Sequence, residues 1–455
     1  MSATTAPTAE PQGLKRVVAA GFMGTTIEYF DFFIYGTAAA LVFPKLFFPA
    51  LGTAAGTAAS FATFGVAFLA RPVGGLVFGQ MGDRVGRKAT LITTMLLMGA
   101  ATVLIGLLPS GNTIGLAAPI LLIVLRFLQG LAVGGEWSSA ALFVVEHAPP
   151  GKRGLYSLAQ TLGTTFGLLL ATLTFLVIGL SISEAAFASW GWRIPFLLSA
   201  ILVAVGMWVR LGVTDTPVFQ DAMAQAEHAK AAKAPVRELF ANQRKEVFLA
   251  SGSVLMWLSF FYMGAVYLTN YGTKVLGIPK NTMLTIQFIA IAGCILGQVI
   301  GARMSDKVGR RAILLAGNGA AVVWAFVLFP MVDTGKPVII GIALTVTLFV
   351  VGLSNASTTV FLPETFRTAY RSTGTGVSFN IGSVVAGALP PILAAPILAG
   401  YGSIGLSIML AVLAAVAVVS VVLMRETSKE SLYDHDHREI EGGTESTDAA
   451  PAVTA

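Results

Sequence analysis

Charged side chains lie inside long apolar stretches of this sequence, and only in the first half of the chain. They are Glu28, Asp31, Arg71, Arg126 and Glu136, with Arg193 near the outer start of a further stretch. The apolar stretches of the second half contain no charge. A charge inside a lipid-embedded helix is costly and is functional by default. We therefore expect charge chemistry to belong to the first half.

Two of these acids and one arginine are predicted to meet at one depth. Glu28 and Arg126 lie roughly 16 Å and 18 Å from opposite ends of their stretches, near the middle of a core about 30 Å thick. Glu28, Asp31 and Tyr35 share a helix face by spacing, as do Arg126 and Gln129. The set predicts a proton-binding centre with Asp31 as main carrier, Glu28 as its partner and Arg126 as counter-ion. A buried structural ion cluster is the alternative.

Fixed positive charge within the first half predicts the kind of ligand. Arginine suits bidentate binding of a carboxylate, so Arg71 and Arg126 favour a small carboxylate-bearing molecule. Pairing of Arg71 with a loop acid is an equal alternative. Uncharged side chains could add hydrogen bonds but carry no proton at ordinary pH. The candidate ligand-binding residues of this kind are Tyr35, Gln129, Tyr262, Tyr267, Asn270, Asn355 and Asn380.

The composition indicates which solvent surrounds these residues. Of the 455 residues, 55% are hydrophobic and 11% charged, whereas about 25% of a soluble domain is charged. The mean hydropathy of +0.78 also predicts a lipid bilayer as the partner of this surface. The net charge of +6 reflects basic cytoplasmic loops, so we expect no nucleic-acid partner.

Metal, cofactor and enzyme chemistry find no support in the residue pattern. All four histidines, His147, His228, His435 and His437, lie in loops or the tail, and no metal or nucleophile constellation is present. The single cysteine excludes an internal disulfide. We therefore expect a non-enzyme without metal or cofactor. The acids of the proton-binding centre, Asp31 and Glu28, predict protons as the coupling ion.

The apolar stretches predict an all-α, polytopic membrane protein with twelve spans in two six-helix halves. A transmembrane helix needs about 20 apolar residues, and stretches of that size recur along the chain. Gly130, Gly134, Gly163 and Gly167 predict close helix packing. The expected parts are a segment 1–16, a half 17–212, a central cytoplasmic loop 213–246, a half 247–425 and a disordered tail 426–455. The expected spans are about 17–43, 58–79, 89–108, 114–137, 155–179, 191–211, 247–271, 282–302, 312–332, 338–361, 375–398 and 401–424.

Lysine and arginine are divided unevenly between the two sides of these spans. With the N-terminus inside, inner segments hold 22 of them. The outer loops hold four, which are Lys45, Lys274, Lys280 and Lys336. Cytoplasmic loops are enriched in basic residues. Both termini are therefore predicted to be cytoplasmic, in a multi-pass protein of the plasma (inner) membrane that functions as a monomer.

A charged, glycine-rich turn occurs twice between apolar stretches. The first copy contains Gly79, Asp83, Arg84, Gly86, Arg87 and Lys88, and the second contains Asp306, Gly309, Arg310 and Arg311. Ala302 and Lys307 depart from the pattern in the second copy. The turn resembles the loop signature of the major facilitator superfamily of transporters. By this resemblance the two turns are a conformational latch that holds the cytoplasmic helix ends together in one state.

Further motifs narrow the resemblance. They are Glu28-Tyr29-Phe30-Asp31-Phe32, Arg71-Pro72-Val73-Gly74-Gly75, Arg126-x-x-Gln129-Gly130-x-x-x-Gly134-Gly135-Glu136, Trp190-Gly191-Trp192-Arg193-Ile194-Pro195-Phe196 and Pro363-Glu364-x-x-Arg367-x-x-x-Arg371. In order and spacing they resemble the metabolite:proton symporter family, which includes shikimate, α-ketoglutarate, citrate and proline/betaine transporters. Tyr29 departs from the Trp of many members. The resemblance implies proton-coupled uptake of a small carboxylate-bearing metabolite by alternating access. A proton-coupled exporter and a passive facilitator remain the alternatives.

Overall fold

The computed structural model describes residues 11–84, 87–134, 137, 141–142, 145, 148–149, 151–213 and 236–428. Helices and short connections account for these residues, and no strand occurs among them. The all-α class predicted from the sequence is confirmed.

Six long helices make up the first half of the chain, as described. They are α1 (Pro11–Leu41), α3 (Gly52–Arg84), α4 (Arg87–Leu107), α6 (Ala117–Val133), α8 (Arg153–Ser181) and α10 (Ile194–Val213). Short helices connect them, namely α2 (Phe43–Phe47), η1 (Pro49–Leu51), α5 (Gly111–Ile114), α9 (Glu184–Ser189) and η2 (Gly191–Arg193). Pro72 lies inside α3 without ending it.

The second half is less regular, because π-helical turns interrupt two of its spans. The first span consists of α12 (Val236–Ser253), α13 (Leu255–Tyr262), η3 (Met263–Tyr267), α14 (Leu268–Asn270) and η4 (Tyr271–Val275). The next three spans are α15 (Lys280–Val308), α16 (Arg310–Val332) and α17 (Pro337–Thr365). The chain ends through η5 (Thr368–Tyr370), α18 (Arg371–Gly382), η6 (Ser383–Ala388) and α19 (Leu389–Leu423). Segments η3, η4 and η6 are π-helical.

A kink in α19 separates the end of the eleventh span from the twelfth span. Gly402 has φ +65°, a left-handed conformation that glycine adopts without steric cost. Within the described residues, eight helical stretches are long and apolar enough to cross a membrane, and Ile92–Leu107 and Ala117–Val133 are shorter apolar helices. With α1, and with the stretch through the Gly402 kink counted as two spans, the helices agree with the predicted twelve-span fold.

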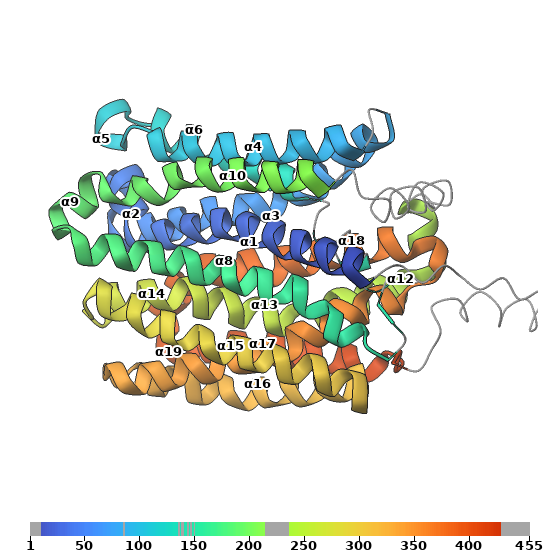
Figure 1. Cartoon of the computed structure of the whole chain (residues 1–455). Helices are drawn as coiled ribbons and strands as arrows, with labels where there is room; N and C mark the ends of the chain where they lie inside the picture. Colours follow the sequence, from blue (N-terminus) through green and yellow to red (C-terminus); the bar gives the residue numbers. More distant parts are fainter. Residues whose placement is uncertain are drawn as a thin grey trace, which may run out of the picture.

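The helices form a single bundle, in which the two halves of the chain lie side by side. In Figure 1 helices α4, α10, α3, α1 and α8 occupy the upper part, and α13, α15, α17 and α16 the lower part. Short helices α2, α5 and α9 lie at one end, and α12 lies at the other. We refer to these as the α9 end and the α12 end.

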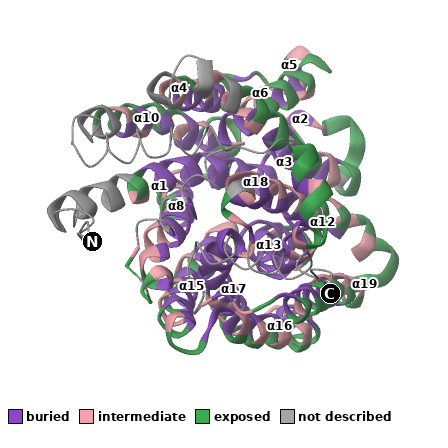
Figure 2. Cartoon of the chain, turned by 90° about the vertical axis from the view of Figure 1, so that its right-hand side faces the viewer, coloured by how far each residue is buried: buried purple, intermediate pink, exposed green. Residues whose placement is uncertain are grey.

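Burial follows the pattern expected in a bilayer. Buried residues line the helix contacts and exposed residues cover outward faces (Figure 2). Leu76, Leu180 and Val323 are 61%, 68% and 68% exposed. So many exposed large apolar side chains mark a surface that does not face water. The chain is a multi-pass membrane protein.

Glycines set the closest helix contacts of the first half, as predicted. A Cβ on Gly130 would lie 2.3 Å from the Ala67 carbonyl oxygen, and one on Gly134 would lie 2.1 Å from that of Arg71. Only glycine permits this backbone approach of α6 to α3. The approach places Arg126 of α6 beside Arg71 of α3.

The first three residues of the tail, which was expected to be disordered, are ordered. Residues 426–428 pack against the α12 end, where Thr427 Oγ1 donates a hydrogen bond to Glu364 Oε2 at 2.7 Å. Polar composition alone predicted the tail to begin at residue 426. The correction comes from partners far apart in the sequence, which composition does not show.

Candidate functional site

A small cavity lies at the predicted centre of the first half. It is lined by Glu28, Asp31, Phe32, Ala67, Arg71, Met98, Arg126, Gln129, Gly130 and Val133. The space in which the centre of a water molecule fits is about 10 Å³, which is roughly enough for one water. The structure therefore shows this centre closed, without room for a metabolite.

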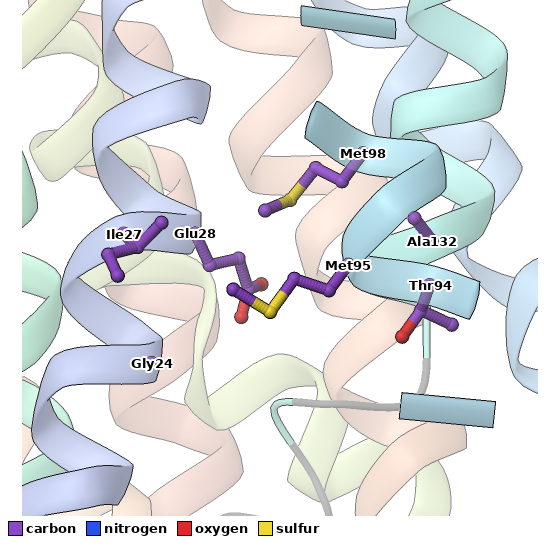
Figure 3. Close-up of a pocket in the computed structure, with 7 residues that line it drawn as sticks. All are labelled: Gly24, Ile27, Glu28, Thr94, Met95, Met98 and Ala132. Atoms are coloured by element: carbon purple, nitrogen blue, oxygen red, sulfur yellow. The ribbon is translucent and has the colours of Figure 1, made fainter. Parts of the chain in front are cut away.

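Glu28 connects this cavity with a second hollow of similar size. Its carboxylate extends from α1 toward Met95 and Met98 of α4, with Thr94 beside them (Figure 3). Gly24, Ile27 and Ala132 also line this second hollow, and Asp31 does not. Glu28 and Asp31 therefore share the first cavity, and Glu28 alone of the two also lines the second hollow.

Asp31 and Arg126 are joined through two intermediate side chains. Arg126 Nη1 donates a hydrogen bond to Gln129 Oε1 at 2.9 Å. Gln129 Nε2 donates to Thr102 Oγ1 at 2.6 Å, and Thr102 Oγ1 lies 3.1 Å from Asp31 Oδ2. The expected counter-ion is thus close to Asp31 but does not form an ion pair with it in the described structure.

Aromatic rings hold the two arginines of the cavity. Phe32 contacts both, with its ring centroid 4.5 Å from Arg126 Cζ and 5.1 Å from Arg71 Cζ. The centroid of Tyr35 lies 4.1 Å from Arg126 Cζ, and that of Phe68 lies 4.8 Å from Arg71 Cζ. Cation–π contacts stabilise a desolvated guanidinium by roughly 2 kcal/mol. Buried positive charge is tolerated here because rings as well as acids surround it.

Several polar atoms of this centre have no hydrogen-bond partner in the structure. They are Asp31 Oδ1, Arg71 Nε, Arg126 Nε and Arg126 Nη2. All three residues are at least 97% buried. Buried donors are almost always satisfied in folded proteins. Guanidinium N–H groups that have no partner in a cavity are therefore suited to donate hydrogen bonds to an anionic ligand.

The polar candidates of the second half are spread over different levels. Tyr262 reaches the centre, with its ring 5.8 Å from that of Phe32 and 5.2 Å from that of Phe68. Tyr267 packs on Phe61 at 5.8 Å. Asn270 Nδ2 donates to the Ala40 carbonyl at 2.8 Å. Asn355 is buried and Asn380 half-buried, and neither lines the cavity.

The second copy of the charged turn contacts the first half at the α12 end. Asp306 Oδ1 and Oδ2 accept hydrogen bonds from the backbone N–H of Gly154 and Leu155, at 2.8 and 2.9 Å. These groups open α8, so the carboxylate also meets the positive end of the helix dipole. Arg310 Nη1 forms an ion pair with Asp306 at 2.9 Å.

Glu364 joins the same contact. Arg153 Nη1 lies 3.0 Å from Glu364 Oε1 and Arg310 Nε lies 3.3 Å from Glu364 Oε2. The Arg153 pair crosses between the halves, and both pairs are nearly inaccessible to water. Breaking one partner of such a buried pair is strongly destabilising. The α12 end is therefore held shut by charge.

The remaining residues of this turn fix the neighbouring helix ends. Gly309 has φ +105°, which favours glycine. Arg311 Nη2 donates to the Val422 carbonyl at 2.6 Å. Glu426 accepts the backbone N–H of Arg310 and Arg311 at 2.9 Å. Burial raises the pKa of Glu426, but these backbone donors outweigh it and hold that pKa below its usual value.

The first copy of the turn lies outside what the structure describes in atomic detail. This applies to the side chains of Asp83, Arg84, Arg87 and Lys88, and to the surroundings of Gly79 and Gly86. Glu136 also lies outside the described residues. Their predicted roles stay predictions.

Comparison with known proteins assigns this architecture to a family. The model of the sugar (and other) transporter family matches residues 17–437. The chain belongs to that family. Its predicted place in the major facilitator superfamily and among metabolite:proton symporter-like proteins is thereby confirmed.

Curated relatives of this transporter cover nearly its whole length. The inner membrane metabolite transport protein YhjE of Escherichia coli is 39% identical over 422 residues, which is 92% of this chain and 95% of the relative. The shikimate transporter of Escherichia coli is 36% identical, over 91% and 95%. The proline/betaine transporter of the same species is 32% identical, over 92% and 85%. These relatives are transporters, so the chain is a transporter rather than an enzyme.

A solved structure supports the same fold for this transporter. The crystal structure of a D-xylose–proton symporter superposes with a TM-score of 0.72 at 15% identity, covering 91% of this chain and 99% of that one. At this identity the likeness shows the fold alone.

The α9 end of the transporter is also bridged between the halves. Lys280 Nζ lies 3.2 Å from Glu184 Oε1 and 3.3 Å from the Phe187 ring centroid. Asn281 Nδ2 donates to the Gly179 carbonyl at 2.8 Å. Because both ends carry contacts across the halves, the structure corresponds to an occluded arrangement.

Sequence reasoning missed several residues of these networks. The sequence pattern does not mark Thr102 or Arg153, and it marks Glu364 only as part of a motif. A threonine in an apolar span gives no periodic signal. Glu364 could have been found from its place near the inner end of a span, where a buried acid needs a basic partner.

Proposed function

We propose that this chain is a proton-coupled symporter for uptake of a small carboxylate-bearing metabolite. The observation that carries the proposal is the closed cavity in which buried Asp31 is linked to Arg126 through Thr102 and Gln129. Arg126 retains donors without partners there. One site thus contains a carboxylate that could take a proton and a cation that could take a carboxylate.

Charge balance suggests how the two events are coupled. When Asp31 takes a proton from the outer side, its negative charge no longer compensates Arg126. Arg126 then binds the substrate carboxylate, and the loaded site has nearly the same net charge as the empty one. A paired, hydrogen-bonded charge costs less to enclose than an unpaired one. Release of substrate inside returns Arg126 to Asp31, which loses its proton.

The arrangement of the arginines favours a carboxylate over a betaine-like cation. Arg71 and Arg126 both lie against one ring, Phe32, and arginine matches a carboxylate with two hydrogen bonds. We infer that shikimate-like or oxo- and dicarboxylic acids bind ahead of betaines. The relatives that carry shikimate and metabolites support this choice.

Transport assays with a defined gradient test the proposal. Vesicles containing the protein are given an inward proton gradient and a panel of shikimate, α-ketoglutarate, citrate and glycine betaine. Accumulation of a carboxylate above the outside concentration is the expected result. Transport only of carboxylate-free solutes would exclude this substrate class. Flux indifferent to the gradient would indicate a passive facilitator, and proton-driven efflux an exporter.

Asp306→Asn is expected to slow transport by roughly tenfold or more, because charge-assisted hydrogen bonds of about 1.5–3 kcal/mol are weakened in the closed α12 end. The loss shifts the populations of the two end states. Initial uptake rates per inserted protein measure the effect. Asp333→Asn is the matched control, since its partners Tyr271 and Ser403 lie in its own half. An unaltered rate for Asp306→Asn would show the turn to be a connecting loop.

The orientation in the membrane follows from the charge distribution. We propose an inner-membrane monomer with both termini and the α12 end in the cytoplasm, because that end borders the basic segments. A reporter enzyme fused after Leu239 should therefore be active in the cytoplasm. Activity confined to the outer face would reverse the orientation.

A further inference from the structure

Thr102 lies where the acid and the arginine of the centre are joined. Its side chain is fully buried on α4. Thr102 Oγ1 is 2.6 Å from Gln129 Nε2, 3.1 Å from Asp31 Oδ2 and 2.9 Å from the Met98 carbonyl oxygen. Three polar partners thus surround one hydroxyl group.

The hydrogen-bond capacity of this hydroxyl is smaller than the demand on it. A threonine hydroxyl has one proton to donate and two lone pairs to accept. The amide N–H of Gln129 occupies one lone pair. The single proton is then directed either to Asp31 or to the Met98 carbonyl, because both are acceptors within reach.

The direction of the hydrogen bonds is fixed at the arginine end. A guanidinium can only donate, so the amide oxygen of Gln129 must face Arg126. The amide nitrogen of Gln129 therefore faces Thr102 and donates to it. No flip of the Gln129 amide keeps both of these bonds.

The direction at the other end depends on whether Asp31 carries a proton. An ionised carboxylate only accepts, so it takes the Thr102 proton and all three bonds point from Arg126 to Asp31. A protonated carboxyl can instead donate to the free lone pair of Thr102. The Thr102 proton then turns to the Met98 carbonyl. Only hydrogen bonds exchange in this step, apart from the proton that Asp31 receives from water.

We propose that Thr102 is a positioning residue that transmits the protonation of Asp31 through Gln129 to Arg126. The inference rests on the proposed proton-coupled function and deepens it. With Asp31 ionised, the aligned chain ends on a charge at each side, and such chains strengthen cooperatively. With Asp31 protonated, the last bond reverses and the chain holds Arg126 less strongly.

The surroundings of Asp31 agree with this role. Charged groups near it are Glu28 on its own helix, Arg71 on α3 and Arg126 on α6, while α4 and α10 contribute the uncharged Thr102 and Ser199. Neither arginine forms an ion pair with Asp31 among the described residues. Weaker retention of Arg126 leaves its partnerless Nη2 and Nε able to turn toward a substrate carboxylate.

Three variants separate this role from packing. Thr102→Val removes the hydroxyl and keeps the shape, whereas Thr102→Ser keeps the hydroxyl. Thr172→Val is the matched control, because Thr172 is fully buried on α8 and its Oγ1 has no hydrogen-bond partner. Each variant is reconstituted as the full chain in proteoliposomes.

Shikimate is the transport probe, measured in two modes. We expect Thr102→Val to reduce proton-driven accumulation by about tenfold, within the range of measured coupling energies, and to leave shikimate-for-shikimate exchange close to the wild-type rate. Thr102→Ser should restore accumulation, and Thr172→Val should resemble the wild type. Equal loss of both modes in Thr102→Val, or failure of Thr102→Ser to restore coupling, would overturn the role.

An infrared titration gives a readout that needs no substrate. The carbonyl band of the protonated Asp31 carboxyl, assigned by its absence in Asp31→Asn, is followed against pH. We expect the titration of this band to change in Thr102→Val and to return in Thr102→Ser. An unchanged band in Thr102→Val refutes the inference even if shikimate is not carried. If the wild type transports without responding to a proton gradient, the proposed function fails as well. If the wild type is proton-driven and Thr102→Val behaves like it, the inference alone fails.

Discussion

Asp31→Asn is expected to abolish accumulation driven by a proton gradient while substrate-for-substrate exchange continues. Asparagine has nearly the shape of a protonated aspartic acid and cannot release a proton, so the carrier is held in its loaded charge state. Exchange needs only the loaded carrier to cross, whereas net uptake needs the empty carrier to return after losing its proton. In proteoliposomes preloaded with substrate, labelled substrate should equilibrate by exchange, while the proton gradient should drive no net accumulation.

Glu28→Gln is the companion to this experiment. Glu28 lines the same cavity but also a second hollow beside Met95 and Met98. We expect it to slow transport and alter its pH response without uncoupling it completely. If Asp31→Asn and Glu28→Gln both still accumulate substrate in response to the gradient, the proton site lies elsewhere.

Arg126→Lys is expected to reduce both uptake and exchange by about 100-fold. Two charge-assisted hydrogen bonds to a carboxylate are replaced by one point contact, a loss of roughly 3 kcal/mol. The ammonium group also loses the planar stacking on Phe32 and Tyr35, and it cannot keep the Gln129 contact in the same geometry. A substrate-binding measurement on purified protein should show the same loss as transport.

Arg193→Lys is the control, because Arg193 is a half-buried arginine that lies outside the cavity. Arg193 donates to the Gly106 and Leu108 carbonyls and lies over the Trp192 ring. Its replacement should reduce the amount of folded protein but not the affinity of the protein that remains. If Arg126→Lys lowers only the amount of protein and leaves binding intact, Arg126 has a structural role.

Much of the architecture could be predicted, because the bilayer imposes a simple rule on sequence. Apolar length located the spans, and the predicted break between the last two, at 398–401, lies next to the kink at Gly402. The π-helical turns were not predicted. They depend on how the side chains between Met263 and Val275 pack against other helices, and a 3.6-residue pattern does not distinguish them from regular α-helix.

The centre was predicted in part. Spacing on one helix placed Glu28 with Asp31, and Arg126 with Gln129, and the structure shows the second pair hydrogen-bonded. The link through Thr102 could not be predicted, since it depends on the rotation of α4 between two other helices. Phe32 belongs to a motif of the sequence, yet its contact with two guanidinium groups only appears once α3 and α6 are in contact.

The contact between α3 and α6 has a consequence for solute size. Backbone meets backbone at Gly130 and Gly134, so these helices have no side-chain layer in which to slide past each other. We therefore expect Arg71 and Arg126 to keep their separation through the transport cycle. We expect them to form a rigid side of the binding site, and Tyr262, carried by the other half, to form the side that moves. Solutes should then be selected by size, according to whether Tyr262 can close against them, so enlarging either glycine should change which solutes fit.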